Sequence, residues 1–156
     1  MTNKTATLPK NPTVFSDVVA KFNSEKLQYG AIKDRNISID SCKKYNVKLG
    51  KANGKDCHVY PYYDKDGTHI INKVRIVETK EFFQEGERGH KTALFGQNLF
   101  KEGGKYITIT EGEIDALSAY QMMGSKWPVV SIRNGAASAA TDIKFNLDYL
   151  NTFDYV

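Results

Sequence analysis

The chain has 156 residues, of which 40% are hydrophobic and 26% are charged, proportions that are typical of a soluble globular protein. It contains no apolar run long enough for a membrane-spanning helix, and its N-terminal stretch lacks the apolar segment of a secretory signal. The net charge of +4 permits an anionic partner without requiring one.

The N-terminal segment, residues 1–24, is polar and contains two prolines, so we expect a flexible tail. The only cysteines are Cys42 and Cys57, which is too few for a disulfide-rich secreted scaffold. Neither cysteine belongs to a C-x-x-C pair, and the histidines do not complete a zinc spacing. We therefore expect a cytoplasmic protein without a zinc site.

Residues 25–103 are predicted to form an α+β lobe, because short alternating runs are separated by turns. The stretch "ISIDSCKKYNV" favours a short helix with a cap at Ser38 or Asp40. A β-hairpin is predicted next, with arms at Cys57–Tyr63 and Thr68–Val77 and the turn "DKDG" between them.

Basic residues gather in the second half of this lobe, interleaved with phenylalanines, and extend into the loop "QEGERGHKTALFG". One interpretation is a solvated surface of strands and loops; the other is a phosphate-binding face. The residues concerned are Lys73, Arg75, Lys80, Arg88, His90 and Lys91.

Residues 104–156 follow a different pattern, in which strands and helices alternate with short connections. Such alternation predicts a parallel, Rossmann-like sheet with right-handed crossovers. The predicted strands are Tyr106–Thr110, Trp127–Ile132 and Phe153–Val156, and the predicted helices are Glu113–Met123 and Thr141–Asn151.

Glu111 directly follows the first of these strands, at the edge where parallel α/β sheets gather their functional groups. Gly112 behind it allows a sharp turn and the close approach of a ligand. Glu113 and Asp115 fall in the first turn of the helix, where acids offset the exposed N–H dipoles. Glu111 is thus a candidate catalytic or metal-binding carboxylate, although it too could merely cap the helix.

The loop "RNGAASAA" contributes Arg133, Asn134 and Gly135 as further candidates. Its small residues could leave free N–H groups directed at an anion. They could equally be needed for a tight turn between strand and helix, and the sequence leaves both interpretations open.

The stretch "ITITEGEIDALSAYQM" followed by "WPVVSIRNGAASA" resembles the Toprim fold of DnaG-type primases, and most of all that of phage-type bifunctional primase–helicases. A looser resemblance, in the same order, runs through "YGAIKDRNISIDSCKKY", "NKVR" and "HKTALFGQNLF". Together these stretches cover about residues 27–155. The resemblance implies that residues 25–103 are the N-terminal subdomain of the primase core and that residues 104–156 are a partial Toprim lobe.

The resemblance also implies a function, the synthesis of RNA primers on single-stranded DNA by metal-dependent nucleotidyl transfer. Glu111 would be the catalytic glutamate and a contact for Mg²⁺. The implied partners are ribonucleoside triphosphates, the DNA template and a helicase domain of the same polypeptide, in the cytoplasm of an infected bacterium, with this piece monomeric. The implied nucleotide- and DNA-binding residues are Lys73, Arg75, Lys80, Arg88, His90, Lys91, Arg133, Asn134 and Gly135.

The sequence departs from the Toprim motif in one respect that limits what the chain is expected to do alone. The Toprim motif needs a later pair of aspartates at the end of the third strand, and the sequence ends at "FDYV" as that strand begins. Asp154 lies too early in the strand, and Asp148 lies on the preceding helix. We therefore expect a lobe truncated at its third strand that does not make primers alone.

Three alternatives stay open at this point. The chain could be a degenerate primase lobe that binds single-stranded DNA and supports the replicative helicase without polymerising. It could be the Toprim part of a topoisomerase or nuclease. It could also be an α+β domain in which "EGE" is only a helix cap.

Overall fold

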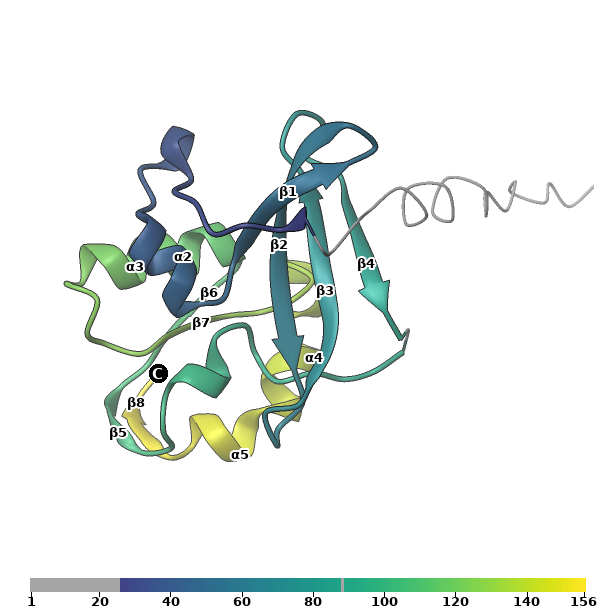
Figure 1. Ribbon diagram of the computed structural model, residues 1–156. Helices are drawn as coiled ribbons and strands as arrows, with labels where there is room; N and C mark the ends of the chain where they lie inside the picture. The colour runs from purple at the N-terminus through teal and green to yellow at the C-terminus, as the bar shows by residue number, and fades with distance from the viewer. Residues whose placement is uncertain (1–25, 88) are drawn as a thin grey trace, which may run out of the picture.

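The computed structural model describes residues 26–87 and 89–156, which form a four-stranded antiparallel sheet beside a set of short parallel strands (Figure 1). The predicted tail lies outside the described residues. The strands are β1 (Lys48–Ala52), β2 (Lys55–Tyr63), β3 (His69–Ile76), β4 (Phe82–Gly86), β5 (Gly104–Tyr106), β6 (Thr108–Thr110), β7 (Val129–Ser131) and β8 (Phe153–Tyr155). The helices are η2 (Lys33–Arg35), α2 (Ile39–Lys44), η3 (Gln97–Leu99), α3 (Glu113–Met122), η4 (Ala136–Ser138), α4 (Ala139–Phe145) and α5 (Leu147–Leu150).

The antiparallel sheet has the order β1-β2-β3-β4, so the predicted hairpin forms its centre. Its turn is held by Asp64, whose Oδ1 accepts hydrogen bonds from the backbone N–H groups of Asp66 and Thr68 at 2.9 Å each. The predicted helix cap is also confirmed, because Ser38 Oγ accepts the backbone N–H of Ser41 at 3.1 Å.

The parallel pairing predicted for the second half is present: β6 pairs with β7, and β5 pairs with β8. The predicted single strand over 106–110 is interrupted at Ile107, however. There the backbone N–H of Ile107 donates to Tyr155 O, whereas that of Thr108 donates to Pro128 O. The chain therefore changes partner from β8 to β7 at this point, which divides one strand into two.

The predicted helix over 141–151 is likewise two helices, α4 and α5, separated at Asn146. The buried Asn146 side-chain amide donates to Thr92 O at 3.3 Å and to Asp142 O at 3.0 Å. A polar side chain that satisfies backbone carbonyls in this way competes with regular helix geometry. The prediction of one continuous helix was wrong for this reason.

The short parallel strands form two separate two-stranded sheets, β5-β8 and β6-β7, and the segment around Phe95 connects the second of these to the antiparallel sheet. The Phe95 backbone pairs with Ser131 of β7 through two hydrogen bonds, while the nearby Ala93 N–H donates to Tyr63 O at the end of β2. The Phe95 ring packs in one hydrophobic cluster with residues from both of the predicted lobes, among them Tyr62 of β2 and Leu117 of α3. No helix within residues 26–87 and 89–156 has the length and apolar character needed to cross a membrane.

Candidate active site

Glu111 follows β6 at the carboxyl end of the strand, and its side chain is exposed. The helix α3 begins after Gly112, and no side-chain hydrogen bond caps it. Glu111 forms no hydrogen bond or ion pair with the residues that the structure describes, so its carboxylate is available to a ligand. The Glu111 side chain therefore does not cap α3.

The loop between β7 and α4 runs beside Glu111. Gly135 in this loop has φ 70° and ψ −172°, a backbone conformation that is essentially restricted to glycine. A β-carbon added to Gly135 would lie 3.7 Å from Oε1 of Glu111. The loop backbone therefore approaches the carboxylate closely.

Asp142 shapes the same loop, because its Oδ2 accepts the backbone N–H of Arg133 at 3.0 Å and the hydroxyl of Ser138 at 3.2 Å. A carboxylate thus takes up donors that an anionic ligand would need. α4 is a short helix of 7 residues, preceded by the 3₁₀ turn η4. These contacts favour the tight-turn interpretation of "RNGAASAA" over the anion-binding one.

A hollow of about 200 Å³ lies between β3, β4 and this loop. Two of the predicted binding residues on its wall, Arg133 and Asn134, come from the loop, and Lys73 comes from β3. The structure thus brings together side chains that are about sixty positions apart in the sequence. The complete lining is Ile71, Lys73, Phe82, Phe83, Gln84, Arg133 and Asn134.

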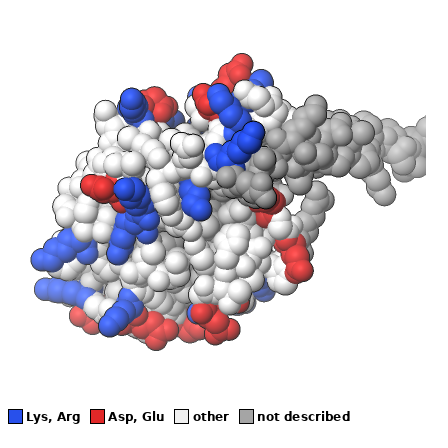
Figure 2. All heavy atoms as spheres, viewed as in Figure 1, with Lys and Arg blue, Asp and Glu red and all other residues white. Residues whose placement is uncertain are grey.

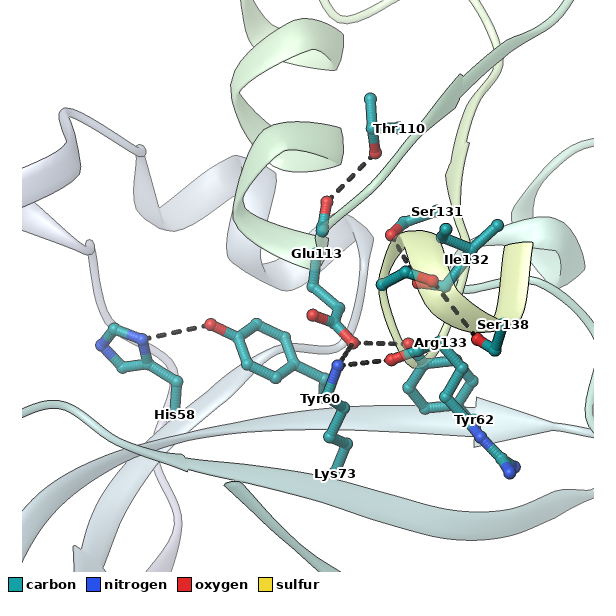
Figure 3. A network of polar contacts seen from close by, with 12 residues as sticks. His58, Tyr60, Tyr62, Lys73, Thr110, Glu113, Ser131, Ile132, Arg133 and Ser138 are labelled. Atoms are coloured by element: carbon teal, nitrogen blue, oxygen red, sulfur yellow. Dashed lines mark hydrogen bonds and ion pairs between the residues drawn. The ribbon is translucent and has the colours of Figure 1, made fainter. Parts of the chain in front are cut away.

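A largely buried polar network adjoins the hollow through Lys73 (Figure 3). Glu113 Oε1 accepts hydrogen bonds from the Tyr62 hydroxyl at 2.5 Å and from Lys73 Nζ at 2.8 Å. Lys73 Nζ also donates to the backbone carbonyl of Arg133 at 2.5 Å. The side chains of Lys73 and Glu113 are only 16% and 4% exposed, so this ion pair is largely shielded from water.

Glu113 therefore does more than the sequence indicated. It lies in the first turn of α3 as expected, but its side chain points into the protein instead of toward solvent. Burial, with the Glu113 carboxylate beside it as a second cause, raises the pKa of Tyr62 well above its usual range. Tyr62 consequently stays protonated and acts as the donor in this contact.

Arg75 lies two positions from Lys73 on the same face of β3, and both cations lie over the exposed Phe82 ring of β4. Lys73 Nζ is 4.6 Å and Arg75 Cζ is 5.8 Å from the ring centroid. The Arg75 Nε is buried and has no hydrogen-bond partner among the described residues. Lys73 and Phe82 line the hollow, and Arg75 continues this basic and aromatic strip along β3 outside it.

The other predicted binding residues that the structure describes are not among those that line the hollow. The carbonyl of His90 accepts Arg133 Nη1 at 3.0 Å, which places His90 next to the hollow. Lys91 Nζ lies 5.5 Å from the Phe145 ring centroid. Lys80 is exposed in the turn between β3 and β4 and is not among the residues that line the hollow, and Arg88 is outside the described residues.

The charges on the face drawn in Figure 2 are not gathered into one patch. Lysine and arginine side chains are scattered between uncharged surface, and acidic side chains lie along the lower edge and also near the top and at the right. Charge alone therefore does not mark this face as an anion-binding surface.

A divalent metal is compatible with this site only as a partly protein-bound ion. No group of three or more His, Cys, Asp or Glu side chains within residues 26–87 and 89–156 could hold a metal. Mg²⁺ commonly takes one or two carboxylates and completes its shell with waters and substrate phosphates, so Glu111 fits as one ligand. Asp148 lies on α5 as predicted, where its carboxylate is paired with Lys65 Nζ at 2.9 Å.

Residues 27–86 match the family described as "Bacteriophage T7 DNA helicase/primase, N-terminal a+b fold". The chain is also 35% identical over 139 residues to the DNA helicase/primase of Enterobacteria phage T3. That match covers 88% of this chain and 24% of the phage T3 protein, so the chain spans about a quarter of its relative's length.

Solved structures of phage primase–helicase proteins also match this chain. The primase fragment of the bacteriophage T7 primase–helicase protein matches with a TM-score of 0.75 and 35% identity, over 85% of this chain and 54% of that one. A second match, with a TM-score of 0.76 and 35% identity, covers 85% of this chain and 67% of a chain in a larger complex. That complex contains T7 lagging-strand DNA polymerase interacting with primase domains of two gp4 subunits bound to an RNA/DNA hybrid and dTTP.

The catalytic core of E. coli primase matches at 14% identity with a TM-score of 0.54, over 80% of this chain and 52% of that one. At this level of identity the match shows a shared mixed α/β fold.

Proposed function

This chain belongs to the phage T7-type DNA helicase/primase family, in its N-terminal primase region, and from that premise we propose that it forms part of an RNA-primer polymerase. Its share would be to bind a ribonucleoside triphosphate beside the DNA template and to provide one catalytic carboxylate. The helicase part would belong to the same polypeptide, and the host cytoplasm would be the site of action.

The observation that carries this proposal is the position of Glu111. Its exposed carboxylate follows β6, next to the Gly135 loop, and that same loop forms one wall of the basic hollow. In this proposal, a carboxylate suited to a cation is paired with nearby side chains suited to phosphate. This is the combination that nucleotidyl transfer requires, because the triphosphate carries negative charge that must be neutralised.

Different side chains would bind the phosphates, the base and the metal ion. Arg133 brings a guanidinium to the wall of the hollow, with its Nη1 already donating to the His90 carbonyl, and Asn134 adds an exposed amide beside it. The exposed Phe82 ring offers an apolar surface on which a base can stack. Glu111 would hold Mg²⁺, which when bound neutralises the triphosphate and promotes attack by a 3′-hydroxyl.

The parallel strands β5 to β8 with α3 would correspond to the Toprim lobe, and the sheet β1–β4 to the N-terminal subdomain of the primase core. In this assignment the hollow lies where the two predicted lobes meet. The template and the nucleotide would both reach the site from that side.

Filter binding to labelled single-stranded DNA at increasing salt tests the nucleic-acid part of the proposal. We expect measurable binding. The logarithm of the binding constant should fall linearly with the logarithm of the salt concentration, with a slope of about −0.7 for each neutralised phosphate. Binding that is undetectable at low salt, or that does not change with salt, would contradict the proposal. Binding of DNA without Mg²⁺-dependent binding of nucleotide would instead favour a non-polymerising primase lobe.

A further inference from the structure

Lys73 makes all of its strong contacts inside the protein. An ammonium group has three N–H donors, and two of them reach Glu113 Oε1 and the carbonyl of Arg133, at 2.8 Å and 2.5 Å. The ammonium also lies 4.6 Å from the centroid of the Phe82 ring. Although Lys73 borders the hollow, its charge is already matched by a buried carboxylate, so little remains for a phosphate.

The contacts of Lys73 flank Glu111 on both sides. Glu113 is two residues after Glu111, across the turn at Gly112, and it is anchored to β2 by the Tyr62 hydroxyl as well as to β3 by Lys73. Arg133 is two residues before Gly135, whose backbone lies against the Glu111 carboxylate. One ammonium group thus ties the turn that carries Glu111 to the loop that faces it.

We propose that Tyr62, Lys73 and Glu113 form a latch that positions Glu111 against the loop between β7 and α4. The inference rests on the proposed function in so far as Glu111 is the catalytic carboxylate. All three are positioning residues, and Lys73 acts through Glu113 and the Arg133 carbonyl instead of as a phosphate ligand.

The cost of burying an unpaired charge provides a test of the latch through the stability of single and double variants. Removal of one partner of a shielded ion pair leaves an uncompensated charge, whereas removal of both leaves none. Lys73→Met and Glu113→Gln should therefore each destabilise the protein, and the double variant should lose less stability than the sum of the two. Tyr62→Phe removes only one hydrogen bond to Glu113, so it should have a smaller effect in the same direction and keep the fold.

The test combines amide hydrogen exchange with nucleotide binding in the wild-type chain and these four variants. We expect exchange to rise about tenfold at residues 108–116 and 131–138 in Lys73→Met and Glu113→Gln, to rise less in Tyr62→Phe, and in each variant to rise more there than in β1. The affinity for Mg²⁺–ATP should fall about tenfold in Lys73→Met and in Glu113→Gln and less in Tyr62→Phe, and the double variant should bind no more weakly than either of the first two.

Lys65→Met is the matched control, since it removes a lysine from the more exposed ion pair with Asp148. It should leave both the exchange of the two segments and the affinity for Mg²⁺–ATP unchanged.

Two results would contradict the proposal that these three residues position Glu111. One is unchanged exchange at residues 108–116 and 131–138 in Lys73→Met, Glu113→Gln and Tyr62→Phe. The other is tighter binding of Mg²⁺–ATP by Glu113→Gln, because that would mean Glu113 withholds Lys73 from phosphate. If no form of the chain binds nucleotide but exchange rises as expected, the latch stands and the proposed function fails.

Discussion

Glu111 and Gly135 lie against each other at the carboxyl end of the parallel strands, and a β-carbon on Gly135 would be 3.7 Å from Glu111 Oε1. That spacing is an ordinary van der Waals contact, so an added methyl group would narrow the space beside the carboxylate without colliding with it. The backbone of Gly135, at φ 70° and ψ −172°, imposes a second constraint, because other residues are strained there.

Gly135→Ala should therefore reduce stability by about 1–3 kcal/mol, measured by urea unfolding, and should also weaken Mg²⁺-dependent nucleotide binding. Gly124→Ala is the control: Gly124 has φ 76° and no atom within 4 Å of an added β-carbon. The control should be destabilised but bind nucleotide normally. Equal nucleotide binding by the two variants would mean that the Gly135 loop does not contribute to the site.

His58 should make stability depend on pH. Burial, together with the positive charge of the cross-strand neighbour Arg75, lowers the pKa of His58, so the fold favours the neutral ring. Its stabilising effect is complete above the ordinary histidine pKa of about 6.5 and is lost as the pH falls toward the lower folded value. The free energy of unfolding, measured with urea, should fall more between pH 7.5 and 5 in the wild type than in His58→Gln.

The control for this measurement is His69→Gln, at the exposed start of β3. It should show the same loss of stability on acidification as the wild type. If His58→Gln and the wild type lose stability in parallel, His58 is not the responsible group.

The cysteines should be unreactive in the folded protein. Both are buried, and burial raises the pKa of the Cys57 thiol to about 11. Because the thiolate is the reactive form, alkylation at pH 8 should be on the order of a hundredfold slower than in urea-unfolded protein. Rapid labelling of Cys57 without denaturant, detected by peptide mass mapping, would show that the sheet around β2 is open.

Lys91 should contribute to the salt dependence of DNA binding. It is exposed and lies one residue from His90, whose carbonyl accepts the Arg133 side chain. Lys91→Gln should make the slope of log affinity against log salt shallower by about one phosphate contact. Lys33→Gln, an exposed lysine on η2, should leave the slope unchanged, and equal slopes in both variants would show that Lys91 faces only solvent.

The sequence predicted the elements well wherever local signals agree. The Asp64 turn, the Ser38 cap and the strand before Glu111 are each encoded by a few neighbouring residues, and each is present. The breaks at Ile107 and Asn146 were missed because they depend on distant partners, Tyr155 for the first and Thr92 for the second. No pattern within a single segment carries that information.

The candidate site likewise combines local features with contacts between distant residues. The position of Glu111 could be predicted because the end of a parallel strand is a local feature. The pairing of Glu113 with Lys73 could not, since the two residues are forty positions apart and Glu113 already had a sufficient explanation at the start of a helix. The basic run was also heterogeneous in a way that the sequence does not show: Lys73 is largely buried, whereas Lys80 is exposed in a turn.

The most direct test of the central claim is the effect of Mg²⁺ on ribonucleoside triphosphate affinity in the wild type and in Glu111→Gln. Asp115→Asn, another exposed acid near the start of α3, is the control. Glu111→Gln should keep its stability to within about 0.5 kcal/mol, since the side chain is exposed and caps nothing. We predict that Mg²⁺ tightens nucleotide binding in the wild type and in Asp115→Asn, and that Glu111→Gln loses most of this gain. An equal gain in all three proteins would contradict the assignment of Glu111 as the metal-binding carboxylate of a primase site.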